Sequence, residues 1–158
     1  MSAPYLFLHS WSWVHAARKK GLPSAYSGRA YTIMAKPRPR LGEVGDGFCS
    51  ALVPRGEALK LMEELVRLRR LGVEDAALLA RYQGLLVASW RAELPRLAPG
   101  RLMAGGVPVA AGDVLACACS AADALAGRCH RSWASKVLVE VGWRVRQDGK
   151  EICDVGRS

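Results

Sequence analysis

Val114-Leu115-Ala116-Cys117-Ala118 is a run without charged residues, and it is followed by Cys119 and then by Cys129-His130-Arg131-Ser132. A short uncharged run of this kind predicts a strand that is buried on both faces, as in a parallel sheet. The segment from Ser132 to Val141 has the apolar spacing of a helix and ends before Gly142. From Trp143 to Arg146, apolar and basic residues alternate as in a strand. The stretch therefore predicts a strand, a loop, a helix and a strand.

Further strands and helices are expected on the N-terminal side of this stretch. Tyr5 to Leu8 and Arg29 to Ala35 are apolar runs typical of strands. Helices are expected over residues 11–20, 56–71 and 75–93. Strands separated by helices predict an α/β fold, here a small single-domain three-layer sandwich with a largely parallel, Rossmann-like sheet.

Length and composition fit one folded domain. The chain has 158 residues, of which 51% are hydrophobic and 23% are charged, as in ordinary globular proteins. We expect one α/β domain over residues 1–146 and a peripheral C-terminal tail over residues 147–158. No apolar run approaches the roughly 20 residues of a membrane span, and the first residues do not resemble a signal peptide. Five cysteines, an odd number, are unlike a secreted disulfide framework, so a cytoplasmic protein is expected.

The chain is strongly basic, with a formal net charge of +9 and a pI near 9.8. A positive field concentrates anions, so the expected partner is nucleic acid or a phosphate-bearing small molecule, and no membrane. Charge alone does not choose between the two. Arg67, Arg69 and Arg70 end a predicted helix, where cations complement the helix dipole, so they do not by themselves indicate a nucleic-acid surface.

Three polar segments follow the predicted strands. His9-Ser10 comes after the first strand, residues 36–40 (Lys-Pro-Arg-Pro-Arg) after the second, and the cysteine loop after the third. In open parallel sheets, ligands bind outside the carboxyl ends of the strands. These segments are therefore expected to meet at one edge of the sheet.

Cys129-His130-Arg131 lies at the start of the predicted helix, where free backbone N–H groups favour an anion. Arg131 could grip a phosphate or carboxylate with two hydrogen bonds, and the same field would lower the pKa of Cys129. Cys117 is expected to be a small apolar side chain of its strand. The expected anion- or ligand-binding residues are Arg131, Arg38, Lys36, Ser132 and Cys119. The candidate catalytic residues are Cys129, His130, His9 and Ser10.

Zinc is an alternative ligand of the same segment. Cys117, Cys119, Cys129 and His130 offer four metal-binding side chains. Their spacing differs from the usual paired zinc knuckle, and adjacent residues rarely point at one ion, so zinc is the less favoured cofactor. The cysteine-arginine spacing of a phosphatase loop is absent after Cys117, Cys119 and Cys129. The sequence also lacks a Walker loop and a G-x-G-x-x-G motif after a strand.

The run from Leu115 to Cys119, followed by Cys129-His130-Arg131-Ser132 and a helix ending near Gly142, resembles domain-of-unknown-function family 488 in its phage-like Cys-x-Cys variant. Leu8-His9-Ser10 and Lys36-Pro37-Arg38 are similar to two N-terminal motifs of that family. The resemblance implies that eight residues form one cluster: His9, Ser10, Arg38, Cys117, Cys119, Cys129, His130 and Arg131. The chain departs from the family at Leu8, where a glycine is usual, and at Cys119, where many members have glutamate. The family implies no reaction.

Three hypotheses follow from the sequence. The favoured one is an anion- or nucleotide-binding site at the Cys-His-Arg loop, with Cys129 or His130 as the reactive group if the protein is an enzyme. The second is a basic nucleic-acid-associated protein, and the third is a zinc-stabilised interaction module. The sequence leaves open whether the protein is an enzyme.

Overall fold

The computed structural model describes residues 5–21, 26–119 and 129–152. The main sheet has five strands in the order β2-β5-β1-β6-β7. Its strands are β1 (Tyr5–Ser10), β2 (Ala30–Thr32), β5 (Val114–Cys117), β6 (Arg144–Gln147) and β7 (Lys150–Ile152). The first four pair in parallel, and β7 is antiparallel to β6. The expected α/β fold with a largely parallel sheet is therefore confirmed.

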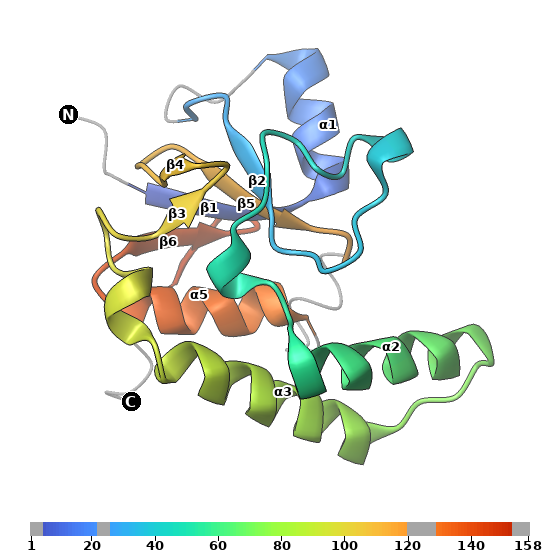
Figure 1. Cartoon of the computed structure of the whole chain (residues 1–158). Coiled ribbons are helices and arrows are strands. Elements are labelled where there is room, and N and C mark those ends of the chain that lie inside the picture. The colour runs from blue at the N-terminus through green and yellow to red at the C-terminus, as the bar shows by residue number, and fades with distance from the viewer. Residues whose placement is uncertain (1–4, 22–25, 120–128, 153–158) are drawn as a thin grey trace.

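Helices lie on both sides of this sheet (Figure 1). They are α1 (Trp11–Lys20), α2 (Gly56–Arg70), α3 (Ala76–Arg91) and α5 (His130–Glu140). α1 lies on one side, and α5 lies on the other, between the sheet and α3. α2 and α3 pack on each other as a pair beyond α5 (Figure 1). A small second sheet is formed by β3 (Met103–Ala104) and β4 (Val107–Pro108).

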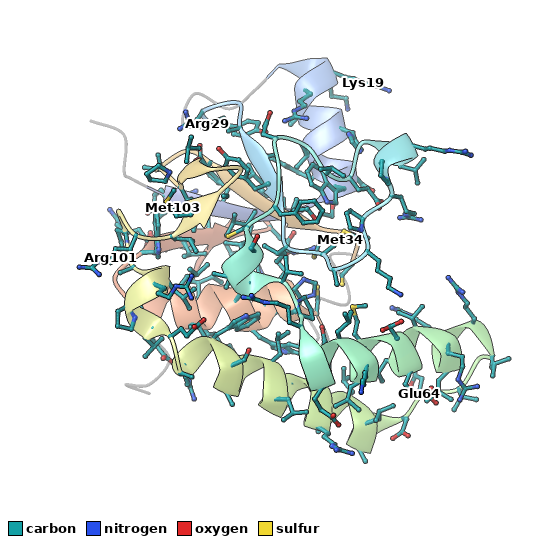
Figure 2. All side chains as sticks on the ribbon, viewed as in Figure 1. Lys19, Arg29, Met34, Glu64, Arg101 and Met103 are labelled. Carbon is teal, nitrogen blue, oxygen red and sulfur yellow. The ribbon has the colours of Figure 1, made fainter. Side chains whose placement is uncertain are left out.

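The alternation of side chains along β1 divides the core into two clusters. Tyr5 and Phe7 pack with Trp11 and Val14 of α1. Leu6 and Leu8 face the opposite way and join the cluster that includes Trp133 of α5. Successive side chains of a strand point to opposite faces, so a wholly buried strand needs apolar cover on both. The outer faces of the helices carry charged side chains, such as Glu64 on the α2–α3 pair and Lys19 on α1 (Figure 2).

Local signals in the sequence set the ends of several elements. Ser10 caps α1 by accepting a hydrogen bond from the Trp13 N–H, and Asp75 caps α3 in the same way from Leu78. Asp148-Gly149 makes the two-residue turn between β6 and β7, with φ values of 49° and 84°. Two positive φ angles are what a tight hairpin turn needs, and Asp-Gly is a preferred pair for it.

Most predicted elements are present, with small shifts of their bounds. The helices predicted over 11–20, 56–71 and 75–93 are found as α1, α2 and α3. The strand predicted over 29–35 is shorter, and the last helix begins at His130 rather than Ser132. The tail predicted from residue 147 is wrong for residues 147–152, which end β6 and form β7, and residues 153–158 lie outside the described part. None of the described helices has both the length and the apolar character to cross a membrane.

Candidate thiolate site

The carboxyl ends of β1, β5 and β6 lie next to one another at one edge of the sheet. Ser10 pairs with Cys117 across β1 and β5, and the Asp148 N–H donates to the Leu8 carbonyl 3.0 Å away. Parallel strands bring their ends together in this way. The predicted meeting of the first strand with the cysteine segment is therefore observed.

Three cysteines gather at this edge. The Sγ atoms of Cys117 and Cys129 are 3.4 Å apart, and the Sγ atoms of Cys117, Cys119 and Cys129 all lie within 4.8 Å of one another. Cys117 and Cys129 are buried, whereas Cys119 is half-buried. All three are free thiols. We call these three residues the cysteine cluster.

Cys129 belongs to the cluster and also caps the N-terminus of α5. It is the N-cap residue of the helix, and its Sγ accepts a hydrogen bond from the Arg131 N–H at 3.4 Å. A helix N-terminus carries a partial positive charge and favours a negative group in this position. The group at this helix start is therefore a sulfur atom of the protein itself.

Arg131 is fully buried and its guanidinium is turned toward the protein's own groups. Nη1 donates to the Cys117 Sγ at 3.2 Å and to the Cys119 carbonyl at 3.0 Å. Nε and Nη2 donate to the Asp148 carboxylate at 3.2 and 3.1 Å. Arg131, which was expected to bind an external anion, thus forms an internal ion pair and contacts a sulfur atom.

The three thiols do not ionise alike. Hydrogen bonds from the Cys119 and Cys129 thiols hold the pKa of Cys117 well below its usual value, with a smaller contribution from His130 and Arg131. The hydrogen bond with Cys117 raises the pKa of Cys119 to about 12, and contacts with Cys117 and Cys119 raise the pKa of Cys129. The first negative charge of the cluster is therefore favoured on Cys117, and the predicted lowering of the Cys129 pKa is wrong.

His130 is buried at the start of α5 but does not belong to the group formed by the sulfurs. Its Nε2 lies 3.0 Å from the carbonyl oxygen of Ile33, so Nε2 carries the hydrogen and donates it. Among the described residues, the group that could hold a metal ion consists of the three cysteines. Of the four ligands considered for zinc, the structure thus brings three together.

His9 and Ser10 lie at the same edge with partners of their own. The His9 ring stacks on Trp13 with 3.6 Å between ring centroids, and its Nδ1 is 3.9 Å from the Asp148 carboxylate. Burial, and secondarily the charge of Arg131, lowers the pKa of His9 to about 4. His9 is therefore neutral at pH 7, and the Ser10 hydroxyl oxygen caps α1.

The other predicted ligand-binding residues have local partners. Lys36 and Arg38 are exposed and form ion pairs with Glu63 at 2.7 Å and with Glu43 at 2.6 Å. No described contact joins either of them to the cysteine cluster. The Ser132 hydroxyl accepts a hydrogen bond from the Gln147 side chain. The loop between Cys119 and Cys129, over residues 120–128, lies outside the described residues.

Sequence reasoning missed Asp148, the carboxylate that neutralises Arg131. The segment from Gln147 was expected to be a tail, although Asp148-Gly149 is a strong hairpin signal. The turn places Asp148 directly beyond the end of β6, at the same edge as Cys117. Recognition of the turn would have added an acidic residue to the predicted site.

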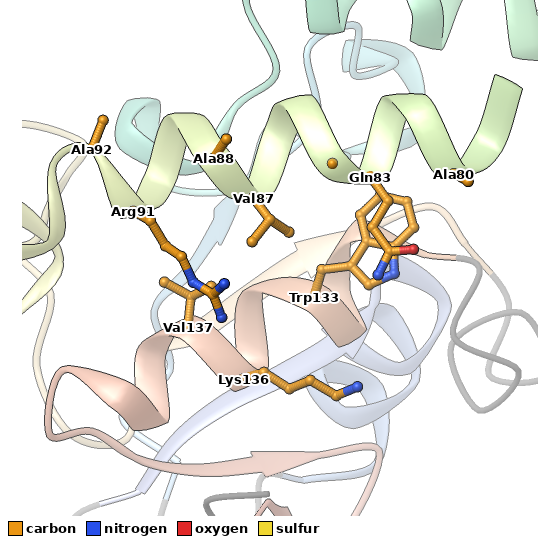
Figure 3. A pocket seen from close by; sticks show the side chains of 10 residues that line it. Ala80, Gln83, Val87, Ala88, Arg91, Ala92, Trp133, Lys136 and Val137 are labelled. Atoms are coloured by element: carbon orange, nitrogen blue, oxygen red, sulfur yellow. The ribbon is translucent and has the colours of Figure 1, made fainter. Parts of the chain in front are cut away.

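A separate open groove of about 760 Å³ lies between α3 and α5 (Figure 3). Its α3 side is lined mainly by small side chains, and its α5 side by Trp133, Lys136 and Val137. The cysteines do not line it. Trp133 connects the groove to the core, because its ring packs edge-on against Tyr82.

Comparisons with known proteins give no assignment for this site. No protein-family model, no curated protein and no solved structure matches the chain.

Proposed function

We propose that the protein binds a zinc-class cation through Cys117, Cys119 and Cys129. The observation that carries this proposal is the presence of three Sγ atoms within 4.8 Å of one another. Zinc–sulfur bonds are about 2.3 Å long, so two sulfurs on one tetrahedral ion stand about 3.8 Å apart. The 3.4 Å between Cys117 and Cys129 and the 4.8 Å limit of the cluster bracket that separation.

The surroundings of the sulfurs favour their charged form. A metal ion binds thiolates, and three thiolates with one divalent cation leave one negative charge. The guanidinium of Arg131 donates to the Cys117 Sγ, and the N-terminus of α5 points at Cys129. Both interactions stabilise negative charge on sulfur inside the protein. A fourth ligand would complete the tetrahedral shell.

The geometry favours a metal over the other roles that the sequence suggested. An external phosphate would compete with Asp148 for Arg131, which is fully buried. Cys117, whose pKa is lowered, is fully buried and is therefore a poor nucleophile for a bulky substrate. A metal ion needs neither a free arginine nor an exposed thiolate, because it can replace the protons that the three thiols share.

Metal analysis tests the proposal. Reduced, chelator-treated protein should take up one equivalent of zinc, and cobalt in its place should give the near-ultraviolet absorption of sulfur-to-metal charge transfer. Cys117→Ser, Cys119→Ser and Cys129→Ser should each weaken zinc binding at least about tenfold. Cys49→Ser is the matched control, since Cys49 is also buried and lies outside the cluster.

Two results would refute the proposed metal centre. One is the absence of stoichiometric zinc binding by folded, reduced protein. The other is zinc that stays bound when the three cysteines of the cluster are replaced together. Zinc bound to the native state should also raise the free energy of unfolding, by about 2.7 kcal/mol when free zinc is at 100 times its Kd.

A nucleic-acid partner is the second candidate function, and the net charge of +9 favours it. It is compatible with a metal centre, because the charge belongs to the whole chain and the cluster to one edge of the sheet.

We also propose a Rossmann-like three-layer classification, which is supported by α1 and α5 on opposite sides of the sheet (Figure 1). Reduced thiols fit a location in the cytoplasm.

A further inference from the structure

We propose a second activity of the same three cysteines in their metal-free state, namely thiol–disulfide exchange with a small-molecule disulfide. Cys119 is the thiol that meets the substrate, and Cys117 and Cys129 form the final disulfide. This proposal goes beyond the metal centre, because it needs the positions of the sulfurs and no metal ion.

Exposure assigns the first role to Cys119. It is half-buried, whereas Cys117 and Cys129 are 0% and 1% exposed. A substrate of several atoms can therefore reach the sulfur of Cys119 before it reaches the other two. The three sulfurs lie within 4.8 Å of one another, so a disulfide that forms on Cys119 is within reach of both other thiols.

Distance assigns the second role to Cys117 and Cys129. Their sulfurs are 3.4 Å apart, and closing a disulfide of about 2.0 Å needs a movement of about 1.4 Å. Cys117 ends β5 and Cys129 caps α5, so the bond would join two elements that already pack together. The guanidinium Nη1 of Arg131 donates a hydrogen bond to the Cys117 Sγ and would stabilise that sulfur as a thiolate while it attacks.

The exchange proceeds in three balanced steps. The Cys119 thiolate attacks one sulfur of R–S–S–R, forming Cys119–S–S–R and releasing R–S⁻. The Cys117 thiolate then attacks the Cys119 sulfur, forming a Cys117–Cys119 disulfide and releasing the second R–S⁻. Cys129 attacks the Cys117 sulfur, which gives the Cys117–Cys129 disulfide and restores Cys119. In sum, two protein thiols lose two electrons and two protons, and one disulfide is reduced to two thiols.

Oxidised glutathione is the probe for this activity. The experiment uses full-length, chelator-treated protein in a background with Cys49→Ser and Cys153→Ser, and it identifies disulfides by mass spectrometry of unreduced digests. The expected end product is the Cys117–Cys129 disulfide. Adding Cys119→Ser should slow its formation at least about tenfold without changing the product. Adding Cys117→Ser and Cys129→Ser together should instead stop the reaction at the mixed disulfide of Cys119 with glutathione.

The proposal is overturned if Cys119→Ser is oxidised as fast as its parent, or if the parent forms no Cys117–Cys129 disulfide. Circular dichroism of each variant shows whether it is folded, and Cys119→Ala serves as a second variant if the serine protein unfolds. Zinc binding is measured on the reduced protein beforehand. Protein that holds no zinc but forms the disulfide refutes the metal centre alone, and protein that holds zinc but forms no disulfide refutes the exchange alone.

Discussion

Arg131 joins the cysteine cluster to the last two strands through its ion pair with Asp148. We expect Arg131→Met, which keeps much of the side-chain volume, to lower the free energy of unfolding by about 3–5 kcal/mol, because it leaves the carboxylate of Asp148 without its buried counter-ion. Urea denaturation measures the loss. Arg91→Met is the control, and its exposed pair with Glu140 should contribute less than about 1 kcal/mol.

Equal losses for the two variants would contradict this assignment and would mean that Arg131 contributes no more than a surface arginine. A small loss for Arg131→Met with a large loss of zinc affinity would be a different outcome. It would show that the guanidinium acts on the sulfurs more than on Asp148.

His9 gives a prediction on pH. Its pKa is about 4 in the folded protein and about 6.5 when unfolded, so the unfolded state binds the proton more tightly. The stability that His9 contributes is complete above pH 6.5 and is lost as the pH falls toward 4, by about 3 kcal/mol in total. Two oppositely charged groups lie near the His9 ring, namely the carboxylate of Asp148 and the guanidinium of Arg131.

His9→Phe keeps an aromatic ring against Trp13 but cannot titrate. Urea denaturation at several pH values between 7 and 4 should show a smaller loss of stability for this variant than for the natural protein. Parallel curves over that range would contradict the low pKa. The comparison is between two proteins, so the carboxylates that titrate in the same range affect both curves.

Single residues show how far the sequence could predict the site. His9, Cys119 and Cys129 were placed at one edge because the ends of parallel strands meet there. The partner of Arg131 could not be predicted, because it depends on the hairpin that carries Asp148 back to this edge. The sulfur cluster itself was undervalued, since Cys117 was assigned to the apolar core and chain spacing does not measure the distance between sulfurs.

Two glycines, Gly84 in α3 and Gly45 beside β2, test how the backbone of these elements limits substitution. Gly84 lies inside α3, and a Cβ added there would meet no atom within 4 Å. Gly84→Ala should therefore stabilise the protein by about 1 kcal/mol, as alanine does in helices. Gly45 has a φ of +59°, and a Cβ there would lie 2.4 Å from the Ala30 carbonyl oxygen. Gly45→Ala should destabilise the protein in the same urea experiment. The two substitutions should change the free energy of unfolding in opposite directions. A loss of stability in both variants would mean that α3 needs its glycine for another contact.

The bounds of the elements were predictable where a capping residue or the regular spacing of apolar residues fixes them. Ser10 and Asp75 cap α1 and α3, so these helices begin where the sequence indicates. α5 begins two residues earlier than expected, because cysteine is an unusual N-cap and Cys129 takes that role through its sulfur. The site is thereby part of the first turn of α5, and the sulfur positions follow from the helix and the strand that carry them.

On the scale of the whole molecule, the two core clusters hold the sheet between α1 and α5, so the cysteine edge is supported from both faces. Burial on both faces explains why β1 and β5 contain no acidic residue, lysine or arginine. The order of the strands was not readable from the sequence, because each of several orders would bury the same apolar runs.

The net charge of +9 is a property of the whole chain and gives the last prediction. If about four phosphates are neutralised on duplex DNA, the logarithm of the binding constant falls with a slope near −3.6 against the logarithm of salt concentration. Affinity should then decrease about 100-fold between about 50 and 200 mM salt, as measured by fluorescence anisotropy. Two unrelated DNA sequences should bind alike, since this attraction is to phosphate and not to bases. Absent binding at low salt, or binding that salt does not weaken, would remove nucleic acid from the candidate partners and leave the positive charge to serve a smaller anion.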